Sequence, residues 1–375
     1  MIRFRQKAGR RSPGAFQYPG LFFCPGRSGK KKDLQNAGAG GIFEAENINE
    51  SGRCVMNYLA IDIGGTAVKV GLVSEEGKVL GKASYPADFD GYRTPLLETA
   101  LKGAADFVLR LAPGDGEGLS AVQAAKALEL GGIGISATCL IDTVRGRVAG
   151  AHFPNYQGAE LKKSFEERFG LETHVVNDAN SAALAELWTG NMKGCRDAIL
   201  ITLGTGIGGG IIVNGELLNG AHGFAGEVGH VSIKKDGPLA AYGNRGGYEE
   251  YASTKALVKR VEARLIEENR ELPVEGLSGR SVFALVAQGD PLVTQVLSEW
   301  MDDILVGIEN LIYIFDPERI VIGGGISAEE KMLIQPLEKR LKEHLMPTYR
   351  ADIQVVPAVH HNDAGLIGAV YSFVN

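Results

Sequence analysis

An aspartate, two glycines and a threonine separate two apolar segments within residues 59–73. Glycine has no Cβ atom, so the backbone N–H groups of Gly64 and Gly65 can approach an anion closely, and the Thr66 hydroxyl adds a further donor. Asp62, which precedes the glycines, is the natural contact for a magnesium ion. These residue types at this spacing therefore indicate a loop that binds phosphate groups beside a metal ion.

The segments on both sides of this loop are rich in β-branched apolar residues, which predicts two strands. Rossmann and Walker loops lead instead into a helix whose N-terminus is directed at the phosphates. A second strand favours a phosphate-binding hairpin, as in actin-like and sugar-kinase ATPases, over a dinucleotide site or a P-loop. The alternative is a Gly-rich turn without a ligand in an ordinary α/β domain.

A similar pattern recurs later in the chain. Residues 204–210 form a second glycine-rich loop between two apolar segments, and residues 323–325 are three glycines after a predicted strand. This third site leads into a helix that we expect near residues 328–345. Two strand, loop, strand units in one chain suggest duplicated lobes that face a shared nucleotide.

Asp178 lies between a short predicted strand, residues 173–176, and a predicted helix, residues 179–187. One interpretation is a helix N-cap, a position that aspartate favours. The other is a general base, because a sugar hydroxyl must lose its proton as it attacks a γ-phosphoryl group. The two roles are compatible, since one carboxylate oxygen can cap the helix while the other accepts the proton.

Glu227 and His230 lie three residues apart in a turn that also contains Gly226 and Gly229. The glycines allow a tight course, so both polar side chains can point the same way. A carboxylate and an imidazole together suit a ligand with several hydroxyl groups. A solvated pair in a surface loop is the alternative.

The chain has 375 residues, which is long enough for two domains with full cores. Residues 1–55 hold ten Lys and Arg against four Asp and Glu, which leaves 29 basic and 41 acidic residues in the remainder. An acidic body argues against nucleic-acid binding. No apolar run approaches the roughly 20 residues that span a bilayer. We therefore expect a soluble protein. The four cysteines form no C-x-x-C pair, so the reducing cytoplasm is the expected setting.

Residues 1–55 are rich in glycine and show no periodic apolar pattern, which predicts a disordered or non-native extension. Met56, directly before the first predicted strand, is a candidate for the biological start. We expect residues 56–176, completed by residues 363–375, to form a first lobe, and residues 177–362 to form a second. Strands and helices are mixed in both, which is typical of an α/β protein.

Five motifs, in this order along the chain, resemble those of the ROK family (repressor, open reading frame, kinase), and the resemblance covers about residues 57–375. The motifs are Asp62-x-Gly64-Gly65-Thr66-x-x-Lys69, Asn177-Asp178-Ala179-Asn180, Gly204-Thr205-Gly206-x-Gly208-Gly209-Gly210, Gly226-Glu227-x-Gly229-His230 and Gly323-Gly324-Gly325. Members are mostly ATP-dependent hexose kinases, and some are sugar-responsive repressors. The resemblance implies the two-lobed actin-like ATPase fold, a duplicated ribonuclease-H-like fold. It also implies ATP and Mg²⁺ as cofactors and a homodimer.

The resemblance also implies roles for individual residues. Asp178 becomes the catalytic base on the sugar 6-hydroxyl, and Asp62 the contact to magnesium. Residues that resemble sugar-binding positions are Glu227, His230, Glu249, Asn155 and Asn177, with an Asx turn as the alternative for Asn155. Those expected to hold the nucleotide are Gly64, Gly65, Thr66, Lys69, Gly204, Thr205, Gly206, Gly208, Gly209, Gly324 and Gly325.

The sequence departs from the family pattern at the position of a structural zinc. Many members bind zinc through this histidine and three cysteines. Here the histidine is His230, but the three cysteine positions hold Ala240, Tyr242 and Gly247. Without thiolates we expect no structural zinc, so His230 must be oriented by another partner, such as a backbone carbonyl. Cys139 stands where the family usually has glycine and is expected to be a buried thiol, with a reactive thiol as the alternative.

Several functions stay open from the sequence. The acceptor is taken as glucose, with N-acetylmannosamine, fructose or a β-glucoside as alternatives within the family. A sugar-responsive transcriptional repressor would need a DNA-binding helix-turn-helix before the first strand, and residues 1–55 offer no such pattern. An actin-like or chaperone-type ATPase would have no use for the sugar-binding set.

Overall fold

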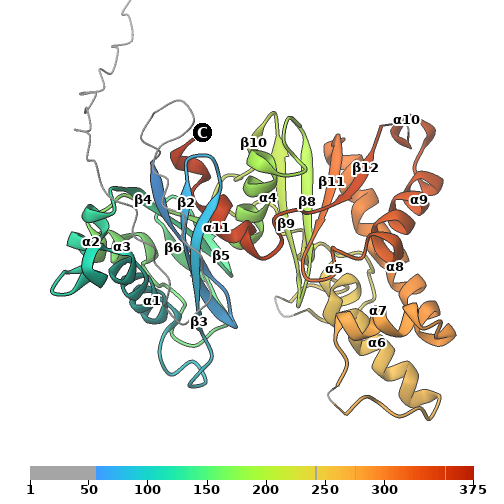
Figure 1. Ribbon diagram of the computed structural model, residues 1–375. Coiled ribbons are helices and arrows are strands. Elements are labelled where there is room, and N and C mark those ends of the chain that lie inside the picture. The colour runs from blue at the N-terminus through green and yellow to red at the C-terminus, as the bar shows by residue number, and fades with distance from the viewer. Residues whose placement is uncertain (1–55, 241–242, 275, 351) are drawn as a thin grey trace, which may run out of the picture.

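The computed structural model describes residues 56–240, 243–274, 276–350 and 352–375, so the predicted extension over residues 1–55 lies outside it. The chain forms two lobes, each built around a five-stranded sheet (Figure 1). No helix in the described ranges has the length and apolar character needed to cross a bilayer.

The first sheet has the strand order β3-β2-β1-β4-β7. Its strands are β1 (Asn57–Ile63), β2 (Ala67–Ser74), β3 (Val79–Pro86), β4 (Leu130–Ala137) and β7 (Thr173–Asn177). The first three strands are antiparallel neighbours, whereas β4 runs parallel to both β1 and β7. The carboxyl ends of β1, β4 and β7 therefore meet at one edge of the sheet, where ligands of α/β proteins commonly bind.

The second sheet repeats this arrangement in the order β10-β9-β8-β11-β12. Its strands are β8 (Ala198–Leu203), β9 (Ile207–Val213), β10 (Glu216–Leu217), β11 (Arg319–Gly323) and β12 (Gln354–Pro357). Here too the first three strands are antiparallel neighbours and the last two are parallel to β8. Equal order and direction in both sheets confirm the predicted duplicated, two-lobed α/β fold.

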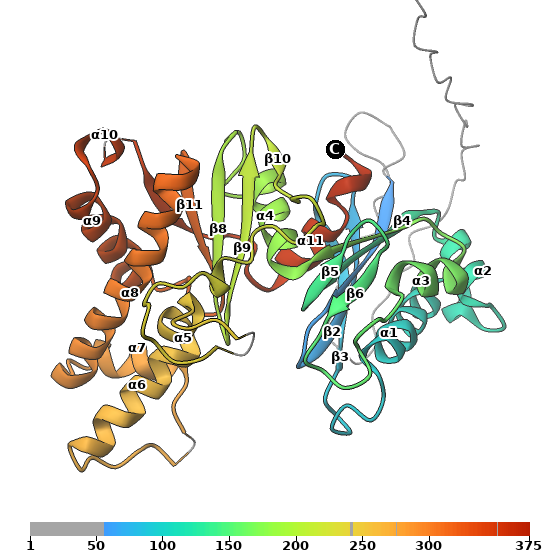
Figure 2. The ribbon, with the colours of Figure 1, turned by 180° about the vertical axis from the view of Figure 1, so that it is seen from behind.

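The helices α1 (Leu96–Leu111), α2 (Ala121–Ala127) and α3 (Leu161–Phe169) cover one face of the first sheet (Figures 1 and 2). Alternate residues of β1 explain this layering. Leu59 and Ile61 are buried in the same core as Phe107 of α1, whereas Tyr58 and Ala60 belong to a cluster on the opposite face. A two-stranded hairpin, β5 (Leu140–Asp142) and β6 (Arg147–Gly150), extends from the end of β4.

The second lobe contains the larger core, formed by its sheet and by several helices, among them one within the segment predicted as a helix near residues 328–345. They are α5 (Tyr248–Ala252), α6 (Thr254–Glu267), α7 (Gly279–Ala287), α8 (Pro291–Phe315), α9 (Gln335–His344) and α10 (Pro347–Arg350). Helix α8 begins sharply because the Asp290 side chain accepts hydrogen bonds from two backbone N–H groups and Pro291 occupies the first turn. Tyr248 is buried against α8, and its hydroxyl donates to the Ile304 carbonyl at 2.8 Å.

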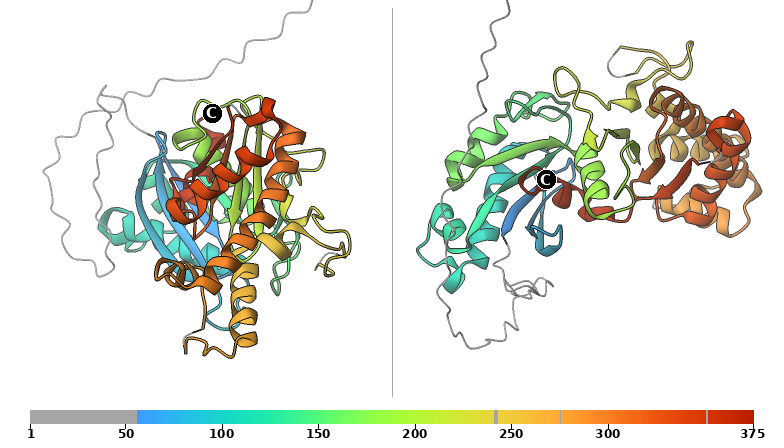
Figure 3. Two further views of the ribbon diagram at one scale, coloured as in Figure 1. Left: turned by 90° about the vertical axis from the view of Figure 1, so that its right-hand side faces the viewer. Right: turned by 90° about the horizontal axis from the view of Figure 1, so that it is seen from above.

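Two helices lie between the sheets, α4 (Asp178–Thr189) and α11 (Ala364–Ala369) (Figures 1 and 3). They cross at Gly368, where a Cβ atom would overlap the Ser181 carbonyl, and the Ser181 hydroxyl donates to the Gly365 carbonyl at 2.9 Å. Helix α11 also lies directly on the first sheet, because a Cβ at Gly134 would overlap the Ala369 carbonyl. This close crossing joins the two lobes through the last helix of the chain.

Candidate functional site

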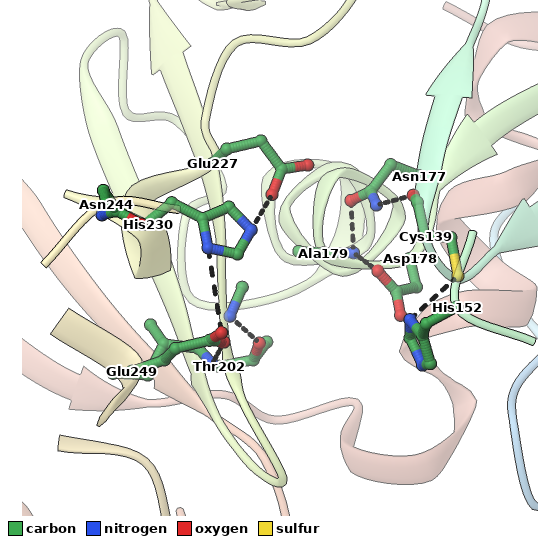
Figure 4. A network of polar contacts seen from close by, with 12 residues as sticks. Cys139, His152, Asn177, Asp178, Ala179, Thr202, Glu227, His230, Asn244 and Glu249 are labelled. Atoms are coloured by element: carbon green, nitrogen blue, oxygen red, sulfur yellow. Dashed lines mark hydrogen bonds and ion pairs between the residues drawn. The ribbon is translucent and has the colours of Figure 1, made fainter. Parts of the chain in front are cut away.

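Asp178 is the first residue of α4, at the point where β7 ends. The N-cap is Asn177, whose side-chain oxygen accepts from the N–H groups of Ala179 at 2.9 Å and Asn180 at 3.2 Å. The Asn177 amide nitrogen donates to the Cys139 carbonyl at 3.0 Å, so both ends of this amide bind backbone (Figure 4). The capping role considered for Asp178 is thus performed mainly by its neighbour, while Asp178 accepts one hydrogen bond from Ala179, at 2.8 Å.

The surroundings of Asp178 raise the pKa of its carboxyl from 3.8 to about 6. Loss of hydration is the main cause, and the negative charges of Asp62 and Glu227 add to it. Hydrogen bonds from the Ala179 N–H and the Thr138 hydroxyl act in the opposite direction. Water nevertheless reaches the Asp178 side chain, which is exposed. A carboxyl group with a pKa near 6 is suited to general-base catalysis near neutral pH.

Asp62 lies at the carboxyl end of β1 and is held by residues of both neighbouring strands. The ammonium group of Lys69 on β2 donates to one carboxylate oxygen at 2.9 Å, and the Ser136 hydroxyl on β4 donates to the other at 3.0 Å. Strand pairing explains both contacts, because Asp62 is in register with Lys69 across one side and with Ser136 across the other. Lys69 also donates to the Asn362 carbonyl at 3.1 Å.

The two glycine hairpins occupy equivalent positions, one after β1 and one after β8. Each is closed by a backbone hydrogen bond at 3.0 Å, from Gly64 to Ala67 in the first and from Gly204 to Gly206 in the second. Thr66 and Thr205 are both exposed at the tips of these turns. Their hydroxyl groups are therefore accessible to a ligand.

A cleft of about 460 Å³ adjoins the second hairpin. The residues that line it are Leu203, Gly204, Thr205, Thr254, Lys255, Val258, Lys259, Ser278, Gly279, Arg280, Gly325 and Ile326. Gly324 has a φ of +96°, and a Cβ there would overlap the Leu203 carbonyl, so this turn depends on glycine. Of the residues predicted to hold the nucleotide, Gly204, Thr205 and Gly325 line this cleft.

Other predicted glycines serve the packing around the site. A Cβ at Gly208 would lie 2.7 Å from the Ala179 Cβ, and one at Gly209 would lie 2.6 Å from the Gly226 carbonyl. Gly206 lies against the Glu249 carboxylate, which a Cβ atom would overlap. These glycines let β9 approach α4 and the turn that carries Glu227.

Glu227, His230 and Glu249 form one group on the second lobe. The His230 ring lies between the two carboxylates, with Nε2 at 3.6 Å from Glu227 and Nδ1 at 3.8 Å from Glu249. Figure 4 shows this group on one side of the site and Asp178 on the other. Burial raises the pKa of Glu227, the charge of Glu249 adds to this effect, and His230 opposes it. The predicted sugar-binding carboxylates and imidazole are therefore brought together.

The segment that carries His230 is held by backbone contacts and by Asn244. The Asn244 side-chain N–H donates to the His230 carbonyl at 2.6 Å, and the Tyr248 N–H donates to the Val231 carbonyl at 2.8 Å. A Cβ at Gly247 would lie 3.6 Å from the Ala240 Cβ, so two positions that resemble zinc ligands are neighbours, and the third, Tyr242, lies outside the described residues. Among the described residues, no group of three or more His, Cys, Asp and Glu side chains is arranged to hold a metal ion.

Asn155 is exposed on the loop after β6 and has a φ of +56°, a conformation that asparagine tolerates better than most residues. Its neighbour Phe153 packs on the first hairpin, because a Cβ at Gly65 would lie 2.6 Å from the phenyl ring. The sequence reasoning missed two residues that contact the acidic groups, Ser136 and Thr138. Both lie at the carboxyl end of β4, and the parallel pairing of β4 with β1 and β7 is the signal that could have identified them.

Comparisons with known proteins agree with this arrangement. The model of the ROK family matches residues 58–374. A glucokinase of Streptomyces coelicolor is 34% identical over 322 residues, covering 83% of this chain and 95% of that protein. A beta-glucoside kinase of Listeria monocytogenes is 33% identical over 320 residues, covering 85% and 98%. The solved structure of a ROK family glucokinase from Streptomyces griseus, in complex with glucose and AMPPNP, is 32% identical with a TM-score of 0.69, covering 84% of this chain and 97% of that one.

Proposed function

This chain belongs to the ROK family, and from that premise we propose that it transfers the terminal phosphoryl group of ATP to the 6-hydroxyl of a hexose. The observation that carries the proposal is the environment of Asp178. Its carboxyl group has a pKa raised to about 6 and faces the group formed by Glu227, His230 and Glu249. A simple ATPase would have no use for such a group opposite its general base.

In the proposed reaction, the sugar binds between Asp178 and the Glu227, His230 and Glu249 group. The 6-hydroxyl oxygen forms a bond to the γ-phosphorus while the bond from that phosphorus to the leaving oxygen of ADP breaks. Asp178 accepts the hydroxyl proton during this transfer. Asn177 and Thr138 support the base, since one caps its helix and the other donates to its carboxylate.

The phosphates of ATP are proposed to bind at the two hairpins, through Gly64, Gly65, Thr66, Gly204, Thr205 and Gly206. Lys69 adds a positive charge beside the first hairpin. The adenosine is proposed to occupy the cleft of about 460 Å³, against Gly324 and Gly325. Exposed threonine tips and glycine backbones fit this role, because N–H and O–H donors are the groups that bind phosphate oxygens.

Asp62 would hold Mg²⁺ in this site. Magnesium is usually bound by one or two carboxylates together with phosphate oxygens and water, so a single carboxylate at the carboxyl end of β1 fits this ion. Bound Mg²⁺ neutralises charge that develops on the phosphate oxygens. Lys69 and Ser136 fix the orientation of the Asp62 carboxylate toward the first hairpin.

An ADP-release assay across a panel of sugars tests the proposal, with glucose, N-acetylmannosamine, fructose and a β-glucoside as acceptors. We expect ATP turnover that depends on one of these sugars and a product phosphorylated at O6, identified by NMR. ATP hydrolysis that no sugar stimulates would support an ATPase instead. If the protein turns over no ATP but binds DNA in a salt-dependent manner, the repressor interpretation would replace the kinase proposal.

Glu227→Gln tests the sugar-binding group separately from the phosphate-binding hairpins. We expect the KM for the sugar to rise by about tenfold, because a hydrogen bond to a charged group is lost. The KM for ATP should stay unchanged. Glu299→Gln, an exposed glutamate paired with Arg264 on the outside of α8, is the matched control and should leave both constants unchanged.

Two further properties belong to the proposal. The first lobe is proposed to comprise residues 56–176 and 363–375, and the second residues 177–362, so that the lobes close on the sugar and exclude water. The family resemblance also implies a homodimer, and analytical ultracentrifugation of the purified protein would measure this oligomeric state.

A further inference from the structure

Cys139 has an unusual backbone conformation directly beside the proposed base. Its φ is +77°, in the left-handed region that favours glycine. The preceding residue, Thr138, donates a hydrogen bond to Asp178, and the Cys139 carbonyl accepts one from the Asn177 side chain at 3.0 Å. The backbone on both sides of Cys139 is thus fixed by hydrogen bonds to the segment that carries Asp178. The Cys139 side chain therefore has a defined position at the edge of the site.

This thiol contacts His152, a residue that the sequence motifs did not include. The distance from the Cys139 sulfur to Nδ1 of His152 is 3.7 Å, and the backbone N–H of His152 also donates to the sulfur. The charges of Asp178 and Glu227 both act on the thiol, which places it within electrostatic range of the base and of the sugar-binding group. Figure 4 shows His152 on the Asp178 side of the site.

The other side of the imidazole ring is held by Phe153. The two ring centroids lie 4.2 Å apart, and Phe153 in turn packs on Gly65 of the first hairpin. Tyr92 packs on Phe153, with the two ring centroids 5.4 Å apart. The Tyr92 hydroxyl donates to the Gly65 carbonyl at 2.8 Å. His152 is therefore supported between the hairpin proposed to bind phosphate and the segment that carries the base, while its side chain remains exposed.

We propose that His152 is a specificity-determining residue that binds the 4-hydroxyl of the acceptor sugar. This inference rests on the proposed function. In a hexopyranose whose 6-hydroxyl faces the base, the 4-hydroxyl and the ring oxygen are the polar groups nearest to the reacting oxygen, and the 2-hydroxyl is more remote. A hydrogen-bonding side chain on the Asp178 side of the site therefore meets the 4-position, whereas Glu227 and His230 meet hydroxyls from the opposite side.

The experiment compares the preferred hexose with its 4-deoxy and 2-deoxy analogues, in the wild-type protein and in His152→Ala. In the wild type, we expect loss of the 4-hydroxyl to lower kcat/KM by about 5- to 20-fold, the range of one hydrogen bond. In His152→Ala this ratio should fall to about twofold or less, because the partner is already gone. The ratio for the 2-deoxy analogue and the KM for ATP should be unchanged.

One control variant and two further variants complete the experiment. His344→Ala removes an exposed histidine of α9 that pairs with Glu309, and all the ratios should stay at their wild-type values. Cys139→Gly suits the positive φ and removes the thiol that contacts His152, so the ratio for the 4-deoxy analogue should fall part of the way. His152→Leu also removes the hydrogen-bonding groups but keeps apolar bulk against Phe153, and it provides the same comparison if the alanine variant folds poorly.

An unchanged 4-deoxy ratio in both His152 variants would overturn the inference, and so would an equal loss of activity with all three sugars, which indicates a structural role. Failure of the proposed function has a different signature. In that case the wild-type protein releases no ADP in response to any sugar, before a variant is compared.

Discussion

Asp178→Asn should separate catalysis from stability, because the same environment that suits a base also destabilises its charged form. Asparagine has nearly the same shape, and its side-chain oxygen can still accept hydrogen bonds from the Ala179 N–H and the Thr138 hydroxyl. Loss of the base should lower kcat by about 10²- to 10⁴-fold, while ATP still binds.

The effect on stability follows from the raised pKa. In the unfolded chain the carboxyl ionises near pH 3.8, whereas in the folded protein it keeps its proton up to about pH 6. Ionisation therefore costs folding free energy, which is absent below about pH 4, grows between pH 4 and pH 6, and is complete above that range. The asparagine variant carries none of this cost.

A shift of this size would correspond to about 3 kcal/mol if the carboxyl were fully buried. Water reaches the Asp178 side chain, so solvent screening reduces the effect, and we expect about 1 kcal/mol. For a protein of 375 residues, that amounts to a rise in Tm of about 1–2 °C. Asp178→Asn should thus be more stable than the wild type at pH 8 and equally stable at pH 4.

Thermal unfolding of both proteins between pH 4 and pH 8 measures this difference, and ADP release measures the loss of turnover. The wild-type rate should also rise as the pH increases through about 6. Asp302→Asn, which removes an exposed carboxylate paired with Arg340, is the control and should change neither property beyond a few tenths of a kcal/mol. A variant with near-normal turnover, or a stability difference that does not grow with pH, would refute the reasoning.

Three further substitutions test the frame of the site. Gly368→Ala inserts a methyl group into the backbone of α4 and should lower the free energy of unfolding by about 3 kcal/mol, whereas Gly325→Ala, which meets open space, should leave it unchanged in urea denaturation. Lys69→Met removes the cation beside Asp62 and should raise the KM for ATP about tenfold, with calorimetric sugar binding unaltered; an unchanged KM would argue against a phosphate contact. Asn177→Ala removes the cap of α4 and should cost about 1 kcal/mol, which Asn177→Ser should restore; equal stability of both variants would contradict the capping role.

Much of the fold could be predicted from local pattern. The hairpins β1–β2 and β8–β9 were identifiable because β-branched segments flank glycine-rich turns, and their repetition indicated duplicated lobes. The helices α5, α6 and α7 were not predicted from the sequence. Helix α5 has only five residues, and its burial against α8 through Tyr248 is a tertiary contact that no local periodicity reports.

The limits at the site have similar causes. Asparagine and aspartate both favour the N-cap, so the pair Asn177 and Asp178 did not reveal which residue caps α4 until the end of β7 was known. Ser136 in β4 and Thr138, which directly follows that strand, belong to no motif in the sequence, and only parallel strand pairing brings them to the carboxylates. His152 and Cys139 lie 13 positions apart on the two sides of the β5–β6 hairpin, a separation over which no motif extends.

The crossing of α4 and α11 links the electrostatics of the two acidic groups to the geometry of the chain. Asp178 begins α4, and a Cβ at Gly365 of α11 would lie 2.5 Å from Cγ of Asp62, so each carboxylate lies against one of the crossing helices. The charge of Asp62 is one cause of the raised pKa of Asp178. Asp62 and Asp178 both lie at the carboxyl ends of strands of the first sheet, so strand pairing fixes their separation. Glu227, whose charge also raises this pKa, lies on the second lobe. Rotation of the lobes about this crossing would change the distance from Glu227 to Asp178, and with it the proton affinity of the proposed base.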